Sequence, residues 1–204
     1  ITTVGGTLSA LSNSGLIYTA TFTPTNNSTT PATFNVLANT FTDGVGNPNT
    51  AATQLSINID TIAPTITITS SASSLKSGET ANLTFTLSEI SANFSASDIT
   101  TVGGTLSTLT QGSGNTYTAT FTPTNNSTTA ATFNVLANTF TDGAGNPNTV
   151  ATQLSITVDT VAPTITIASN KTALSIGENA NLTFTLSEAA STALISSNIT
   201  VAGG

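Results

Sequence analysis

The sequence predicts an all-β chain assembled from tandem modules, and two observations lead to this expectation. The first is a repeat: residues 117–167 recur, with few changes, as residues 18–68, an offset of 99 residues (131 − 32, from Ala131 and Ala32). A period close to the length of a small domain indicates tandem globular modules rather than a solenoid of short repeats. The second is alternation: apolar and hydroxyl side chains alternate in short runs separated by turn residues, which is typical of half-buried strands.

The repeat also predicts where the modules begin and end. The motif ITTVGG opens the chain at Ile1 and returns at Ile99, and its variant ITVAGG ends at Gly204. We therefore expect the chain to be a window on a longer array. Its predicted parts are a partial module with the third to seventh strands, a complete module, and a partial module with the first two strands and the start of the third: residues 1–60, 61–159 and 160–204.

Composition limits the possible partners. The 204 residues include two Lys or Arg and nine Asp or Glu, for a net charge of −7, and no Cys, Met, Trp or His. So few cations exclude a basic surface for nucleic acid and a polybasic anchor for lipid. A disulfide framework is excluded as well, and we expect no direct membrane insertion. The Thr-, Ser- and Asn-rich composition favours an extracellular environment.

Seven short strands are expected in the complete module, and no segment has helical periodicity. Alternation places Leu83, Phe85 and Leu87 on one face of the second strand, for example. Seven antiparallel strands in about a hundred residues are typical of an immunoglobulin-like β-sandwich. The predicted aromatic core is Phe85, Tyr117, Phe121 and Phe133. The predicted strands are residues 64–69, 81–89, 98–104, 105–109, 116–121, 131–140 and 151–158.

An odd number of alternating strands places the entry and exit of each module at opposite poles. The linkers DTIAPT, from Asp60, and DTVAPT, from Asp159, are short and contain Pro64 and Pro163. Proline stiffens such segments. The predicted fold class is therefore a row of tandem seven-stranded immunoglobulin-like β-sandwiches arranged end to end, a rod whose partners are neighbouring repeats of the same or identical chains.

Acidic residues far apart in the sequence are expected to meet at one pole of the complete module. Asp60 lies in the entering linker, Glu89 ends the second strand, Asp98 starts the third, and Asp142 follows the sixth. Taken alone, each of these residues could be a turn former or a solvated loop residue, but the convergence of all four favours a shared site. Carboxylates at close range repel one another and need a compensating cation.

The chemistry of this predicted site favours calcium. The two lysines, Lys76 and Lys171, belong to turns at the opposite pole. Ca²⁺ accepts about six to eight oxygen ligands in flexible geometry, which carboxylates, Asn146 and water can supply. Magnesium demands a tighter octahedron, and zinc is disfavoured without His or Cys. The corresponding residues elsewhere are Asp159, Glu188 and Asn198 at the next junction, with one carboxylate fewer, and Asp43 in the first module.

The ordered motifs DTxAPTITI, LTFTLSE, DITTVGGTLS, YTATFTPT and FTDGAGNPN resemble the Ig-like repeats of giant bacterial surface adhesins and biofilm-associated proteins. The resemblance covers the whole chain. It implies a secreted cell-surface protein whose repeats form a stalk, stiffened by Ca²⁺ at the junctions. The implied ligands are Asp60, Glu89, Asp98 and Asp142, whereas Asn198 departs from the pattern.

Other functions are weighed against this structural spacer. An enzyme is not expected, because carboxylates at a repeated junction are the only catalytic chemistry available. Outward threonine rows suggest a glycan- or ice-binding surface, but they are also ordinary for a soluble sheet. A second alternative is a filament: the tail, residues 161–204, carries the strands that the head, residues 1–59, lacks, so one chain could complete the next by strand complementation.

Overall fold

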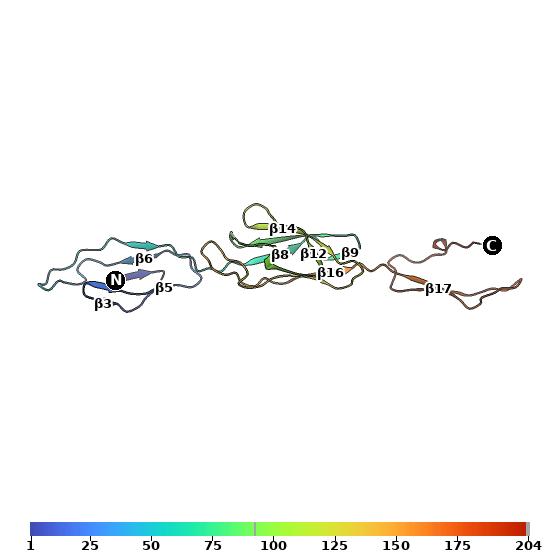
Figure 1. Ribbon diagram of the computed structural model, residues 1–204, viewed down its shortest axis with the longest axis horizontal. Coiled ribbons are helices and arrows are strands. Elements are labelled where there is room, and N and C mark those ends of the chain that lie inside the picture. Colours follow the sequence, from blue (N-terminus) through green and yellow to red (C-terminus); the bar gives the residue numbers. More distant parts are fainter. Residues whose placement is uncertain (92, 203–204) are drawn as a thin grey trace.

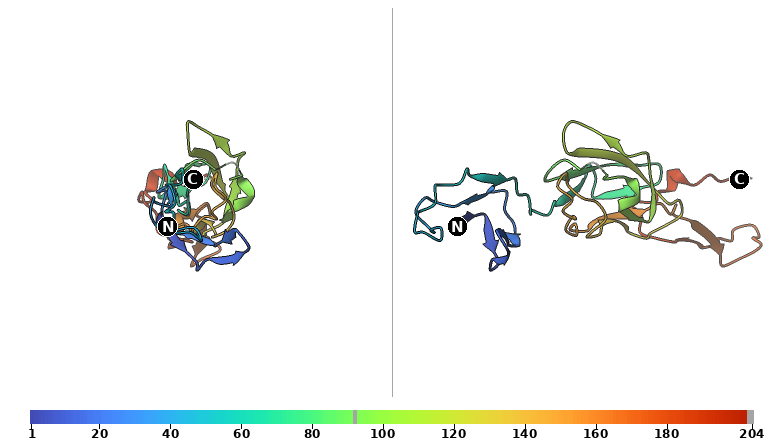
Figure 2. Two further views of the ribbon diagram at one scale, coloured as in Figure 1. Left: turned by 90° about the vertical axis from the view of Figure 1, so that its left-hand side faces the viewer. Right: turned by 60° about the vertical axis from the view of Figure 1, so that its left-hand side comes forward.

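The computed structural model describes residues 1–91 and 93–202, so the closing Gly203-Gly204 of the repeated motif lies outside the described residues. Three segments follow one another along the long axis of the molecule, with residues 1–59 at one end and the C-terminal segment at the other (Figure 1). Viewed almost along that axis, the segments overlap closely (Figure 2). The chain is therefore an extended row of modules. No helix among the described residues is long and apolar enough to cross a membrane.

The complete module consists of two sheets. One has the order β12-β14-β10-β8, with β13 also paired to β14, and the other has the order β11-β15-β16-β9. A 3₁₀ turn, η1 (Ala96–Asp98), precedes β11. The strands are β8 (Ile66–Ser70), β9 (Ser74–Lys76), β10 (Ala81–Leu87), β11 (Ile99–Val102), β12 (Gly104–Leu106), β13 (Thr110–Gln111), β14 (Thr116–Pro123), β15 (Ala131–Val135) and β16 (Leu154–Asp159).

Alternation along these strands builds the core between the sheets. On β10, Leu83, Phe85 and Leu87 are buried, and the side chains between them face outward. Phe121 on β14 contacts Phe133 on β15 edge to face, with ring centroids 4.8 Å apart and planes at 86°. Such pairs add to the free energy gained by burying apolar area. The two sheets thus form one sandwich, which confirms the predicted fold class.

Close packing at the core has a backbone requirement at one glycine. A Cβ atom on Gly104 would lie 2.2 Å from the carbonyl oxygen of Thr122 and 2.6 Å from the Phe121 ring. No side chain fits in that space. The glycine pair that ends the repeated ITTVGG motif therefore allows β12 to lie against β14.

Several details differ from the predicted strands. Residues 74–76, predicted as part of a turn, form β9, which pairs in parallel with β16. The predicted strand 131–140 ends at Val135, and Phe140 lies in the following irregular segment, where it is buried. Phe94, also outside any strand, packs against both Tyr117 and Phe140. The aromatic core is thus larger than the four rings predicted, because irregular segments supply two more.

The flanking segments contain only part of this sandwich. In the first segment, three sheets have the orders β1-β6-β7, β2-β5 and β3-β4; in the last, β17 pairs β18 before a second 3₁₀ turn, η2 (Ser196–Asn198). Their strands are β1 (Thr2–Val4), β2 (Gly6–Leu8), β3 (Ser12–Ser14), β4 (Ile17–Thr19), β5 (Phe22–Pro24), β6 (Ala32–Asn35), β7 (Leu55–Ile57), β17 (Ile165–Ser169) and β18 (Leu182–Leu186).

Each linker is fastened to the module before it by one threonine. The Thr160 hydroxyl donates to the Thr124 carbonyl at 2.7 Å and accepts from the Ser127 N–H at 2.9 Å. Its backbone N–H donates to the Ser127 carbonyl at 2.9 Å. Thr61 makes the same set of bonds to Thr25 and Ser28 at the first linker. The start of each linker is thereby held without any metal.

Replacing Thr160 by valine tests this attachment. Thr160 is 4% exposed. The isosteric change removes both hydroxyl bonds and leaves the part-buried Ser127 N–H without its partner, which costs about 1–2 kcal/mol. Chemical denaturation should show this loss for Thr160→Val. The control is Thr157→Val, at an exposed site within β16, the strand that Thr160 follows, and it should change the free energy of unfolding by less than about 0.5 kcal/mol. Equal effects of the two variants would contradict the proposed role of the hydroxyl.

Candidate metal centre

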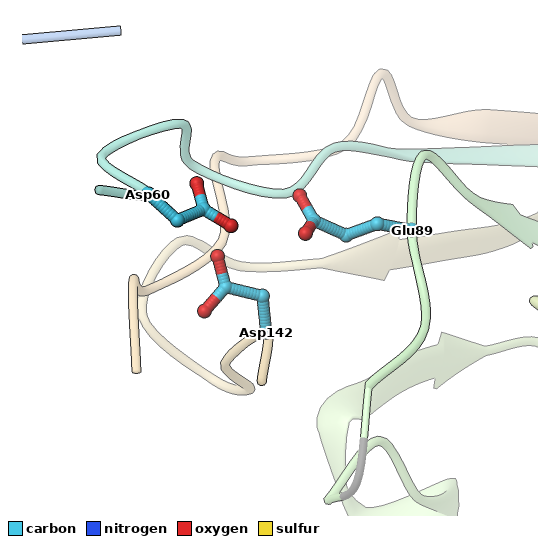
Figure 3. A group of neighbouring side chains, drawn as sticks. All are labelled: Asp60, Glu89 and Asp142. Atoms are coloured by element: carbon cyan, nitrogen blue, oxygen red, sulfur yellow. The ribbon is translucent and has the colours of Figure 1, made fainter. Parts of the chain in front are cut away.

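Three carboxylates from distant parts of the sequence meet at the entrance to the complete module. Asp60 lies on the linker before β8, Glu89 follows the end of β10, and Asp142 lies in the loop after β15 (Figure 3). One oxygen from each lies within 4.8 Å of the others. The antiparallel sheets explain the convergence: β10 returns to the pole where β8 begins, and the chain leaving β15 returns there too.

Local hydrogen bonds fix the loop that carries Asp142. Its Oδ1 atom accepts from the N–H groups of Ala144 and Asn146, at 2.9 and 2.8 Å. Gly145 has a φ of +94°, a conformation that glycine adopts without strain. The Asp142 side chain is therefore held in one orientation, and it is 4% exposed.

Asn146 joins this loop to the linker. Its Nδ2 donates to Asp142 Oδ2 at 2.8 Å and to the Asp60 carbonyl at 3.1 Å. The Thr149 N–H adds a bond to the Pro64 carbonyl at 3.0 Å. The linker is thus fastened at its far end to the module that follows, as Thr61 fastens it to the module before.

The cluster is electrostatically uncompensated. Burial raises the pKa of Glu89 above its ordinary value, and the negative charges of Asp142 and Asp60 raise it further. For Asp142, burial alone also raises the pKa, but hydrogen bonds from Asn146, Ala144 and Gly145 outweigh it, so the pKa is lowered. Both lysines are elsewhere: Lys76 lies 3.6 Å from Glu79, and Lys171 lies 3.2 Å from Glu178. A cation at the cluster would therefore relieve real repulsion.

The donors present fit a hard divalent cation. Three carboxylates supply oxygen ligands, and the Asp60 carbonyl lies beside them, since Asn146 bonds both that carbonyl and Asp142. Rotation of the Asn146 amide by 180° would present its Oδ1 in place of Nδ2. Water can complete the six to eight oxygens that Ca²⁺ accepts, whereas the site offers no nitrogen or sulfur ligand of the kind zinc prefers.

Asp98, the fourth carboxylate predicted here, is not brought into the cluster. Its Oδ2 accepts from the Ser95 N–H at 2.7 Å and from the Ser95 hydroxyl at 3.1 Å, and so closes the turn η1. The expectation overlooked this local role because a carboxylate three residues after a serine can cap a helical turn as readily as it can face the pole. Asn198 does the same in η2, where its Oδ1 accepts from the Ile195 N–H at 3.0 Å.

The related positions do not assemble a second cluster among the described residues. Asp159 Oδ1 accepts from the Val161 N–H at 3.1 Å, as Asp60 Oδ1 does from Ile62. Asp43 repeats the Asp142 loop: its Oδ1 accepts from the N–H groups of Val45 and Asn47, and its Oδ2 accepts from Asn47 Nδ2 at 2.9 Å. These hydrogen bonds, led by that of the Asn47 side chain, lower the pKa of Asp43. Glu188 is exposed. Asp159 and Asp43 thus keep the local hydrogen bonds of their counterparts Asp60 and Asp142, but neither has the other carboxylates of a cluster beside it.

Sequence reasoning missed the residues that brace the site from the loop after Glu89. The Ser91 hydroxyl donates to the Thr141 carbonyl at 2.6 Å, and Asn93 Oδ1 accepts from the Thr141 N–H at 3.0 Å. These bonds join positions about fifty apart in an irregular loop. No periodicity or motif marks them, so the sequence carries no signal by which to find them.

The raised pKa of Glu89 predicts a pH dependence in metal-free buffer. A carboxyl whose pKa is higher in the folded than in the unfolded state binds its proton more tightly when folded, so it adds stability as the pH falls. Glu89→Gln removes this dependence. Denaturation in chelator should find the variant more stable than the wild type at pH 7, with the difference shrinking as the pH falls through the raised pKa. A constant difference across this range would contradict the predicted repulsion.

A comparison with known protein families identifies the family of this chain. The model of a bacterial Ig-like domain family matches residues 1–59, 60–158 and 159–204, which together span the whole chain. The chain belongs to the bacterial Ig-like domain family. The resemblance stated from its motifs is thereby confirmed, and these bacterial Ig-like modules follow one another along the molecule as the repeat predicts.

One solved structure similar to this bacterial Ig-like chain is that of FdeC, described as a broadly conserved Escherichia coli adhesin. The two share 18% sequence identity over 91% of this chain and 60% of the other, with a TM-score of 0.37. This chain thus spans about three-fifths of the length of that structure. A search of curated proteins returned no match.

Proposed function

We propose that this chain is a run of spacer repeats in the stalk of a bacterial cell-surface adhesin or extracellular fibre, with Ca²⁺ stiffening the junctions between modules. Its task is mechanical: to hold whatever adjoins it at a distance from the cell. Catalysis has no part in this role. The membership of the bacterial Ig-like domain family and the end-to-end arrangement of the modules support the proposal.

The observation that carries the proposal is the position of the carboxylate cluster. Asp60 belongs to the linker, whereas Glu89 and Asp142 belong to the module that follows. A cation bound by all three would join the linker to that module. The hydrogen bonds of Thr61 already join the start of the linker to the module before it. Together the two attachments would leave the linker no free segment to act as a hinge.

Calcium titration by calorimetry, with parallel titration of Mg²⁺, tests the site. The wild-type chain should bind Ca²⁺ at the Asp60 cluster and bind Mg²⁺ more weakly, because Mg²⁺ requires a tighter octahedron. Glu89→Gln should remove this binding. The matched control is Glu79→Gln, the same change in the turn before β10, where the carboxylate accepts from the Lys76 N–H instead. Loss of binding in both variants, or in neither, would contradict the assignment.

A further inference from the structure

The chain enters the complete module through β8 and β9 and leaves it through β16, and two of these strands pair directly. β9 lies parallel to β16. The other strand pairs of the module, over the residues that the structure describes, are antiparallel. The Thr157 N–H donates to the Ser73 carbonyl at 3.0 Å and extends the ladder. The paired residues are Ser74 with Thr157, Leu75 with Val158, and Lys76 with Asp159.

The middle of this parallel pair belongs to the core. Leu75 is 4% exposed and Val158 is 2% exposed, and both side chains are part of the apolar cluster between the sheets. Sliding of β9 along β16 would break the hydrogen bonds between the strands and also move these two side chains out of their packed positions. Lost hydrogen bonds and lost packing therefore oppose the same displacement.

Both strands are also held at the end where their pairing finishes. After β9, the Glu79 N–H donates to the Lys76 carbonyl, and the Lys76 N–H donates to a Glu79 carboxylate oxygen, both at 3.1 Å. After β16, the Thr160 hydroxyl donates to the Thr124 carbonyl at 2.7 Å. These bonds fix the neighbouring ends of the two strands and so oppose fraying of the short ladder.

The direction of the two strands determines how tension acts on them. The chain enters the module at one pole and leaves it at the other, along the long axis of the molecule (Figure 1). Tension along this axis draws β9 toward the entrance and β16 toward the exit. Because the strands are parallel, they are pulled in opposite directions along their own length, and their evenly spaced hydrogen bonds are loaded together. Strands drawn apart from one end would instead lose these bonds one at a time.

We propose that the pairing of Ser74–Lys76 with Thr157–Asp159 is a mechanical clamp, which bears tension along the chain and shields the rest of the module from it. Residues 77–156 connect the two halves of the clamp, so the pairing closes them into a loop. Tension reaches this loop only after the clamp breaks. The loop contains β10 to β15 and the contact of Phe121 with Phe133 between the sheets. The presence of tension on the native protein rests on the proposed function, whereas the clamp rests on strand direction alone.

Single-molecule pulling of the 204-residue chain in two directions tests the clamp. Handles at the two ends of the chain load it in shear. A handle on Ser77→Cys, used with the C-terminal handle, draws the neighbouring ends of β9 and β16 apart, and no native Cys competes for this attachment. At equal force the second direction should unfold the complete module about a hundredfold faster, because the bonds break in turn rather than together. Equal unfolding rates in the two directions would overturn the clamp.

Two proline variants test the bonds themselves under end-to-end load. Thr157→Pro removes the N–H that donates to Ser73, at an exposed position of β16 beyond its pairing with β15. At equal force this variant should unfold about tenfold faster than the wild type, because the lost bond is one that the transition state must break. The matched control is Ser107→Pro, which removes an N–H that donates to the Thr120 carbonyl at 2.8 Å inside the shielded loop.

The control should lower the stability measured by chemical denaturation but change the unfolding rate under force by less than about twofold. Equal acceleration in Thr157→Pro and Ser107→Pro would overturn the clamp. If Thr157→Pro does not fold, the two pulling directions still decide, because Ser77 lies outside both strands of the clamp. All pulls are made in chelator, so a clamp that holds in a chain that binds no Ca²⁺ in the calorimetric titration would count against the proposed calcium junction alone.

Discussion

Saturating Ca²⁺ is expected to raise the melting temperature of the complete module, and Asp142→Asn to lose this gain. A ligand at one hundred times its dissociation constant stabilises the folded state by about 2.7 kcal/mol. For a module of about a hundred residues this corresponds to a rise of roughly 10–20 °C. Calorimetric melting with Ca²⁺ and then with chelator measures the shift.

A natural comparison inside the repeat supplies the control for this experiment. Asp98 accepts from the Ser95 N–H, and Asn198 makes the same bond in the last segment. Asp98→Asn should therefore preserve the 3₁₀ turn and keep the full calcium-dependent rise. Both variants remove one negative charge, so a general charge effect would appear in both. A calcium shift that survives in Asp142→Asn would exclude Asp142 as a ligand.

Replacing Phe121 by alanine is expected to produce the largest loss of stability in the apolar core. The side chain is fully buried, and its ring packs against Phe133 and above Gly104. Phenylalanine-to-alanine changes at such positions cost about 3–5 kcal/mol. Because a domain of this size is stable by about 5–15 kcal/mol, the variant should lose much of its margin. Chemical denaturation of the complete module measures the loss.

The control for the core variant is Leu136→Ala in the same module. Leu136 is 53% exposed, so its truncation leaves no cavity. The expected change in the free energy of unfolding is below about 0.5 kcal/mol. If Phe121→Ala were as mild as Leu136→Ala, the contact between the two sheets would not be the source of stability described here.

Much of the fold could be predicted from the sequence because strand alternation is a local signal. The inward positions of β8 and β10 follow directly from residues spaced by two, and they are buried as expected. The burial of Phe94 and Phe140 could not be read this way, since both rings lie outside the strands. Phe94 packs against Tyr117, and Phe140 packs against Phe94, so the positions of both rings depend on contacts across the module rather than on neighbouring residues.

The candidate site was predictable only in part, for a similar reason. The direction of each strand indicated that Asp60, Glu89 and Asp142 would share a pole, and the structure brings them together. Strand direction does not specify which way a side chain turns at the end of a strand. At Asp98 a hydrogen bond to the Ser95 N–H, three residues away, decides the orientation instead. The Asn146 bond to the Asp60 carbonyl likewise spans 86 residues and leaves no local mark.

At the first junction the linker has two different attachments, one to each of the modules that it joins. Thr61 and its counterpart Thr160 each hold a linker to the module before it through hydroxyl and backbone hydrogen bonds. The carboxylate cluster faces the module that follows. The first attachment is independent of metal, so removal of Ca²⁺ should loosen one side of the junction rather than both. A stalk built in this way would soften in chelator without its modules unfolding.

Small-angle scattering of the chain, with Ca²⁺ and then with chelator, tests the central claim most directly. Calcium should give a longer particle with a narrower distribution of lengths, and chelator should broaden that distribution and shorten its mean. An identical scattering curve in the two buffers, together with an unchanged melting temperature, would contradict a calcium-stiffened junction and leave Asp60, Glu89 and Asp142 as residues of an ordinary turn.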